Sequence, residues 1–125
     1  MKKYVIDSFA WMEFFKGTPR GKKVKGILED NKTKKYTTAA NYYELYYRLT
    51  QEKGAAMRNE ALTFIKSNAT LLDVTEEIAS TAGEIRLTEE LNAIDAFTLA
   101  AARRINAHVL TGDKDFEKIK ETEMI

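Results

Sequence analysis

Short apolar runs alternate with helix-like segments along most of the chain, and this alternation restricts the fold more than any other feature. Strands are predicted at residues 3–7, 36–39, 70–74 and 107–111, with an edge strand at residues 124–125. Helices are predicted at residues 8–16, 22–29, 42–52 and 55–67, after Thr75, and at residues 95–106 and 116–120. Parallel strands need crossover connections, usually helical. The alternation therefore predicts an α/β fold, a three-layer α/β/α sandwich around a mainly parallel sheet of four or five strands.

Composition favours one soluble globular domain covering residues 1–125. The chain has 44% hydrophobic and 31% charged residues, with one proline and no linker or repeat, and a chain of this length buries roughly two-thirds of its unfolded surface. No apolar stretch of about 18 residues could cross a membrane, and no signal-peptide pattern is present, so we expect a cytoplasmic protein. The absence of cysteine excludes disulfides and thiolate metal sites, and a single histidine, His108, disfavours zinc.

Four acidic residues at turning points of the predicted fold are the candidate catalytic and metal-binding residues. Asp7 ends the first predicted strand, and Asp113 follows the fourth. Asp95 opens an alanine-rich helix, and Glu44 lies on the helix after the second strand. At least three of these positions are junctions between an apolar run and a helix, and ligands of parallel α/β sheets bind at the carboxyl ends of the strands. We therefore expect the carboxylates to converge.

Helix capping is the alternative explanation of each acid taken singly. Acidic side chains accept hydrogen bonds from the free N–H groups at helix N-termini and suit the helix dipole. Asp7 and Asp95 could be N-caps, and Asp113 could cap the helix at residues 116–120. Asn41 and Glu44 have the spacing of a capping box. Caps have no need to meet at one edge of a sheet, whereas metal ligands must, so the joint pattern favours a metal site.

A cluster of carboxylates dictates the kind of chemistry. Carboxylates held close together repel one another, so they either keep protons at a raised pKa or recruit a hard cation through their oxygens. Mg²⁺ or Mn²⁺ held in this way retains water ligands, lowers the pKa of one of them and neutralises charge that develops on a phosphodiester. The cluster therefore predicts phosphodiester hydrolysis. No glycine-rich phosphate loop is present to favour a nucleotide cofactor.

The charge of the chain is unevenly distributed, although the net charge is only +1. Residues 1–62 contain 13 Lys/Arg against 7 Asp/Glu, whereas residues 63–125 contain 7 against 12. The lysines cluster in two places, at Lys22, Lys23 and Lys25 and at Lys32, Lys34 and Lys35. A basic half can attract a polyanion such as RNA, although a solvated surface explains these lysines equally well.

Several motifs together resemble the PIN-domain ribonucleases, with the VapC-type toxins of toxin-antitoxin pairs as the nearest subgroup. The similarity runs nearly end to end and is most specific between Asp95 and Phe116. The motifs are Val5-Ile6-Asp7-Ser8, Glu44 after the second strand, Ile94-Asp95-Ala96, and Leu110-Thr111-Gly112-Asp113-Lys114-Asp115-Phe116.

The resemblance implies a PIN-like sandwich with a Mg²⁺- or Mn²⁺-dependent endoribonuclease site. Asp7, Glu44, Asp95 and Asp113 match the four metal-site acids of the family, without a departure. Ser8, Thr111 and Asp115 are secondary site residues, Thr111 as the small hydroxyl residue beside the acids and Asp115 as an outer ligand. The implied partners are an RNA substrate, a small antitoxin protein that covers the site, and a second copy of the chain in a homodimer.

Four tyrosines surround Glu44, which are too many for one buried stripe. Tyr42, Tyr43, Tyr46 and Tyr47 form two pairs with i,i+4 spacing on adjacent faces of one helix. We expect a dimer or antitoxin interface, because tyrosine offers a large amphipathic contact area. Stacking on RNA bases and core packing of at least one pair are the alternatives.

Two other classes of function compete with the nuclease interpretation. A receiver-like phosphoacceptor domain needs paired acids after its first strand, and Asp7-Ser8 lacks the pair. A non-catalytic module that binds RNA or protein would explain the basic half and the tyrosines, but it gives no reason for converging acids. Within the enzyme class, a PIN-family nuclease acting in RNA maturation or on DNA is the alternative to a toxin.

Overall fold

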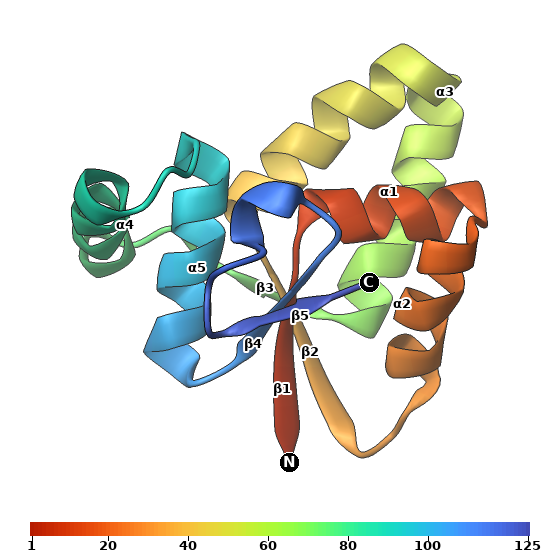
Figure 1. Ribbon diagram of the computed structural model, residues 1–125. Helices are drawn as coiled ribbons and strands as arrows, with labels where there is room; N and C mark the ends of the chain where they lie inside the picture. The colour runs from red at the N-terminus through yellow and green to blue at the C-terminus, as the bar shows by residue number, and fades with distance from the viewer.

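The computed structural model describes residues 1–125 and contains a five-stranded, entirely parallel sheet with helices on both faces (Figure 1). The strands are β1 (Lys2–Ile6), β2 (Thr33–Thr38), β3 (Thr70–Leu72), β4 (His108–Thr111) and β5 (Thr122–Met124). They lie in the order β3-β2-β1-β4-β5. The helices are α1 (Ser8–Lys16), α2 (Pro19–Glu29), α3 (Ala39–Asn68), α4 (Glu76–Thr88) and α5 (Ala93–Ile105). The α/β/α sandwich predicted from the alternation is confirmed.

Strand β1 is the centre of the sheet and contributes to two separate cores. Its successive side chains point to opposite faces. Tyr4 and Ile6 pack with buried residues of α1, α2 and α3, whereas Val5 packs with α4 and α5. A central parallel strand must be apolar on both faces, because helices cover both. This requirement explains why the run from Tyr4 to Ile6 contains no polar side chain that faces solvent.

Helix α1 starts and ends where its sequence predicts. The side chain of Asp7 accepts a hydrogen bond from the N–H of Ala10, which satisfies one free donor of the first turn. Gly17 ends the helix in a left-handed conformation with φ of 68°, a geometry that glycine adopts without steric cost. The following helix α2 begins at Pro19, after the N-cap Thr18.

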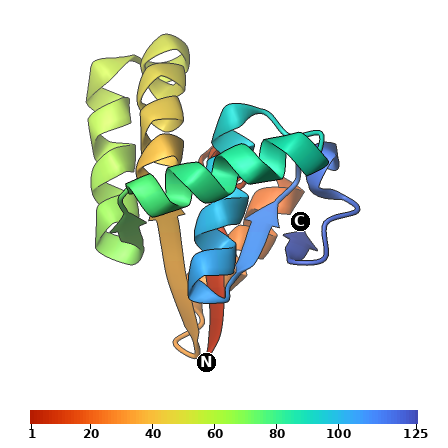
Figure 2. The same cartoon turned by 90° about the vertical axis from the view of Figure 1, so that its left-hand side faces the viewer.

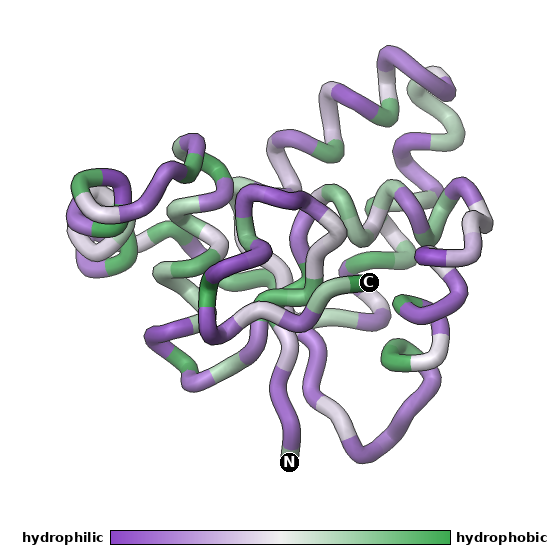
Figure 3. The backbone as a smooth tube through the Cα atoms, viewed as in Figure 1, coloured by the Kyte–Doolittle hydropathy of each residue, from purple (hydrophilic) through white to green (hydrophobic).

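Helix α3 is a long hairpin rather than a single rod. Gly54 has φ of 84° and ψ of 168° in its middle, so the helix breaks there into two arms. Figure 2 shows the arms standing side by side above the sheet, and Figure 3 shows that the tip of the hairpin is mainly hydrophilic. The two helices predicted on either side of Gly54 are thereby confirmed.

Three local predictions are wrong. The helix predicted at residues 116–120 is a short 3-10 turn, η1 (Lys114–Phe116). The capping box joins Thr38 to Asn41 rather than Asn41 to Glu44, because α3 begins at Ala39. Asp95 is not the cap of α5, because Asn92 caps that helix and accepts a hydrogen bond from the N–H of Asp95. Asp95 therefore has a carboxylate that the helix start does not use.

The two edge strands of the sheet, β3 and β5, are short, with three residues each. Strand β5 pairs in parallel with β4, with Thr122 beside Val109. No helix of the structure combines the length and the apolar character that a bilayer crossing demands.

Candidate metal centre

The acidic residues meet at the carboxyl edge of the sheet, between β1 and β4. These strands pair in register, with Ile6 beside Leu110, and the N–H of Asp7 donates to the carbonyl of Leu110 at 3.1 Å. Asp7 therefore lies next to Thr111, at the end of β4. The N-terminal turn of α5 brings Asp95 to the same edge.

Asp7 is buried and held by two hydrogen bonds. Its Oδ1 accepts from the N–H of Ala10 at 2.9 Å, and its Oδ2 accepts from the hydroxyl of Thr111 at 2.5 Å. Burial raises the pKa of Asp7 to about 7 despite these two bonds, which act in the opposite direction, and the charges of Asp113 and Glu44 raise it further. Asp7 is thus both the cap of α1 and a member of the acidic cluster, so the two interpretations of this residue are compatible.

Asp95 is the least satisfied acid of the group. It is only 7% exposed, and its Oδ2 is buried without any hydrogen-bond partner. Burial raises the pKa of Asp95 to about 8, and the negative charges of Asp7, Asp113, Glu44 and Asp115 add to the shift. A buried carboxylate oxygen without a partner is costly. Such an atom marks a place where a ligand is needed.

Asp113 and Asp115 complete a set of three acids with Asp95. One carboxylate oxygen from each lies within 4.8 Å of the others. The turn η1 positions the pair, because Oδ1 of Asp113 accepts from the N–H of Asp115 at 2.9 Å. The N–H of Asp113 in turn donates to the hydroxyl of Thr111 at 3.0 Å. An all-oxygen donor set with an orphaned buried oxygen fits a hard divalent cation such as Mg²⁺ or Mn²⁺.

The predicted site residues do not all enter this set of three. Asp95 and Asp113 do, together with Asp115, which the sequence had placed in an outer role. Asp7 and Glu44 lie outside it, but both act on the pKa of Asp95 through their charge. The structure therefore brings five acids to one edge of the sheet, three of them at metal-ligand spacing.

A buried polar network joins Ser8, which the sequence analysis assigned to the site as a secondary residue, to Asn41 and Thr98, which it did not assign. The side-chain amide of Asn41 donates to the hydroxyls of Ser8 and Thr98, each at 3.1 Å. These residues belong to α3, α1 and α5, so the network joins the three helices that surround the site. The Thr38-x-x-Asn41 spacing at the start of α3 is the only sequence signal, and it indicates a cap. The network fixes the starts of these helices, and with them the acids.

A comparison with protein families decides the classification. The PIN-domain family model matches residues 4–122. The chain belongs to the PIN-domain family. Membership supports the nuclease class predicted from the sequence. No curated protein sequence gave a significant match.

Solved structures share the whole fold of this PIN domain. DNA-bound VapBC from Salmonella typhimurium has a TM-score of 0.79 and 18% identity, covering 100% of this chain and 98% of that one. VapC20 from Mycobacterium tuberculosis, a toxin that cleaves the sarcin-ricin loop, has a TM-score of 0.79 and 18% identity, with 95% of each chain covered. VapBC2 from Rickettsia felis, bound to promoter DNA, has a TM-score of 0.77 and 16% identity, with 98% of each covered. At these identities the similarity confirms the fold.

Proposed function

We propose that this PIN domain is a Mg²⁺- or Mn²⁺-dependent endoribonuclease and the toxin of a type II toxin-antitoxin module. The observation that carries the proposal is the buried, unpartnered Oδ2 of Asp95 at the centre of five converging acids. A cap or a solvated surface acid would not leave an oxygen in this condition. The toxin assignment is supported by the similarity to structures described as toxins or toxin-antitoxin complexes.

The site residues have different proposed roles, which follow from their positions. Asp95, Asp113 and Asp115 would hold the cation, with Asp7 and Glu44 completing its charge balance. The cation would supply a water of lowered pKa and would neutralise charge on the phosphodiester. Glu44 is half-buried, and its charge acts on Asp95, so it would be placed to orient a water bound to the cation. The hydroxyl of Thr111 favours the ionised form of Asp7 by donating to its Oδ2, against the effect of burial, and accepts from the N–H of Asp113.

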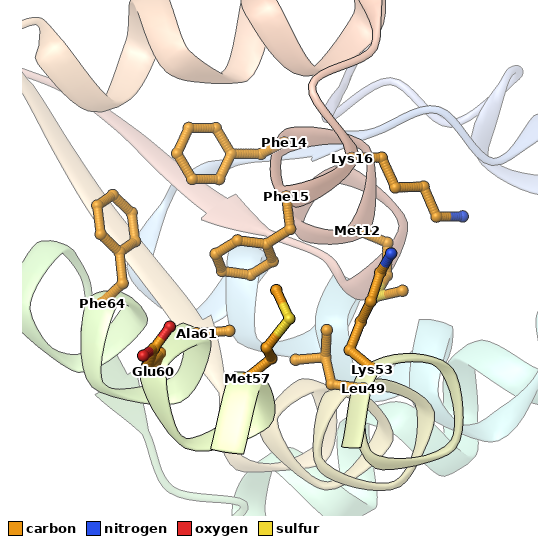
Figure 4. A pocket seen from close by; sticks show the side chains of 10 residues that line it. All are labelled: Met12, Phe14, Phe15, Lys16, Leu49, Lys53, Met57, Glu60, Ala61 and Phe64. Atoms are coloured by element: carbon orange, nitrogen blue, oxygen red, sulfur yellow. The ribbon is translucent and has the colours of Figure 1, made fainter. Parts of the chain in front are cut away.

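An apolar groove between α1 and α3 supports the existence of a protein partner (Figure 4). The groove has a volume of about 280 Å³, and Phe14 stacks on Phe64 across it with ring centroids 5.2 Å apart. Met57 is 54% exposed at its side, and Lys16, Lys53 and Glu60 also line it, so the charged residues of the groove have a net positive charge. Exposed apolar surface with a polar rim marks interaction sites. We infer that an amphipathic antitoxin segment with acidic residues occupies it.

Of the four tyrosines only Tyr42 is partly buried, whereas Tyr43, Tyr46 and Tyr47 are 63%, 44% and 41% exposed. Tyr42 packs against the core, and the guanidinium of Arg58 lies 4.2 Å from the ring centroid of Tyr46. Tyr43 and Tyr47 are exposed, with ring centroids 5.5 Å apart. Tyr43 and Tyr47 are the candidates for a homodimer interface, because both rings are exposed and neither has a cation over it, unlike Tyr42 and Tyr46. Replacing both by Ala is expected to lower the oligomeric mass measured by light scattering, and an unchanged mass together with unchanged antitoxin binding would exclude this surface.

Cleavage of RNA tests the proposal. The protein, freed of any bound partner, is incubated with a pool of structured RNAs in Mn²⁺, Mg²⁺ or EDTA. We expect cutting only with metal, and loss of cutting in Asp95→Asn with an unchanged circular dichroism spectrum. Asp73→Asn is the matched control, because Asp73 is exposed and follows the edge strand β3, which β2 separates from β1. Binding of RNA without cutting in either metal would favour the binding-module alternative, and cutting of DNA alone would favour a DNA nuclease.

The partner is tested separately by co-expression with the product of a small reading frame adjoining the gene. We expect a stable complex with the wild-type chain and a weaker one with Met57→Glu, which places a charge in the apolar groove. Equal complex formation by both chains would place the partner elsewhere.

A further inference from the structure

A second concave surface lies away from the acids and has the opposite charge. It is a pocket of about 510 Å³ between the middle of β2, the C-terminal turn of α3 and the start of β3. Its charged lining residues are Lys34, Lys35 and Lys66, and no acidic residue lines it. Polar groups of Ser67, Asn68 and Thr70 complete the wall. The pocket is therefore a concentrated positive region with hydrogen-bonding groups around it.

No carboxylate neutralises these lysines. The four ion pairs of the structure use Lys2, Lys16, Arg103 and Arg104 as their cations. Lys35 donates only to the carbonyl of Asp30, at 2.6 Å. The Nζ of Lys66 lies 5.9 Å from the centroid of the Tyr42 ring, a weak contact at this exposed position.

Strand pairing adds to the local excess of positive charge. Lys34 stands in register with Lys3 of β1, so two lysines occupy neighbouring positions on adjacent strands. The Nζ of Lys3 donates to the carbonyl of Ile105 at 3.1 Å, so Lys3 adds positive charge beside Lys34 without lining the pocket. The lysines at residues 22, 23 and 25 lie on α2 and do not line the pocket. The lysine-rich sequence therefore separates into a convergent group and a dispersed one.

We propose that this pocket binds the phosphodiester backbone of the RNA substrate at a distance from the point of cleavage. The inference rests on the proposed nuclease function and adds a second contact to it. Lys34 precedes Thr38, at the acidic end of β2, by four residues, which corresponds to about 13 Å along a strand. Thr37 and Thr38 are buried, so an RNA strand that reaches both the pocket and the acids would pass around the outside of the sheet and needs several nucleotides. The lysines of the pocket hold the RNA backbone by its negative charge, and the acids cleave a phosphodiester linkage farther along the same RNA strand.

The test measures binding and cleavage independently in the Lys34→Gln/Lys66→Gln variant. A fluorescein-labelled single-stranded RNA is titrated in EDTA at several salt concentrations, and binding is followed by anisotropy. Each neutralised phosphate contributes about 0.7 to the slope of log affinity against log salt for single strands. We therefore expect the slope to fall by roughly 1.4 and the affinity to fall about tenfold at low salt. In Mn²⁺, KM should rise by a similar factor while kcat is unchanged.

The matched control is Lys22→Gln/Lys25→Gln, which removes the same charge from exposed positions on α2. Unchanged binding in this control, with the expected loss in the pocket variant, supports the inference. Equal losses in both variants would show a diffuse charge effect and overturn it, as would unchanged binding in the pocket variant or preferential binding to anionic lipid vesicles. If the wild-type protein binds RNA with the expected slope but never cuts, the anion pocket stands and the nuclease function fails.

Discussion

Replacing Asp95 by Asn is predicted to stabilise the metal-free protein at neutral pH, although it should abolish cleavage. Burial and the neighbouring acids raise the pKa of Asp95 to about 8 from its ordinary value of 3.8. Between these two values the native state binds more protons than the unfolded chain. The free energy of unfolding therefore falls as pH rises from about 4 to 8. Asn carries no charge, so the Asp95→Asn variant does not lose this part of its free energy of unfolding as pH rises.

The size of the effect follows from the shift. One pKa unit corresponds to about 1.4 kcal/mol, so the shift at Asp95 lowers stability at pH 7 by about 4 kcal/mol if solvent screening is ignored. Screening by water at the mouth of the site reduces this to roughly 2 kcal/mol. For a chain of this length that value raises Tm by about 8 °C.

Urea and thermal unfolding in EDTA between pH 5 and 9 provide the assay. Asp95→Asn should be more stable than wild type above pH 6 and should show a shallower fall of stability with pH, with the remaining slope due to Asp7. Asp73→Asn, at an exposed acid, should match wild type throughout. An Asp95→Asn variant that is less stable at pH 7.5, or that keeps the wild-type pH dependence, would refute the assignment of Asp95 as a strained, unpartnered acid.

Two further predictions concern helix packing and the hydroxyl beside the acids. Gly21→Ala should destabilise the fold by about 2 kcal/mol or more, because a Cβ there would collide with the backbone of Glu13. Gly26→Ala on the same helix is the control, because a Cβ there meets no atom and should stabilise the fold by up to about 1 kcal/mol. Urea unfolding measures both variants, and equal effects would contradict the close packing of α1 on α2. Thr111→Val removes the hydrogen bond that lowers the pKa of Asp7. The pH of half-maximal cleavage should therefore rise by roughly one unit and return in Thr111→Ser, and an unshifted pH profile would show that this bond does not control the site.

The parts of the fold that sequence predicts well are those governed by local chemistry. Helix α1 has its boundaries set by the cap Asp7 and by Gly17, and both are visible in the sequence. Strand β2 is three residues longer at its start than predicted, because Thr33 to Lys35 are polar and pair in register with β1 only once the sheet exists. Partners supplied by another strand override a weak local propensity.

At the candidate site, too, features set by local chemistry can be predicted from the sequence, whereas features set by distant partners cannot. The convergence of Asp7 and Asp113 follows from the rule that the carboxyl ends of parallel strands share one edge. Asp95 lies on α5, which follows α4 rather than a strand, so this rule does not account for its position. The position of Asp115 depends on a 3-10 turn closed by Asp113, and a helix was predicted a few residues later. The role of Asn41 depends on hydroxyls from two other helices. Contacts between elements distant in sequence leave no local pattern from which to predict them.

Titration of Mn²⁺ into the partner-free, EDTA-treated protein, followed by calorimetry, tests the metal centre most directly. The account predicts saturable binding to the wild-type chain and to Asp73→Asn, with strongly weakened binding to Asp95→Asn and Asp113→Asn. Proton release should accompany binding near neutral pH, because the pKa of Asp95 lies at about 8 in the metal-free state. Absence of saturable binding to a folded wild-type chain, or equal binding by all four proteins, would contradict the metal centre.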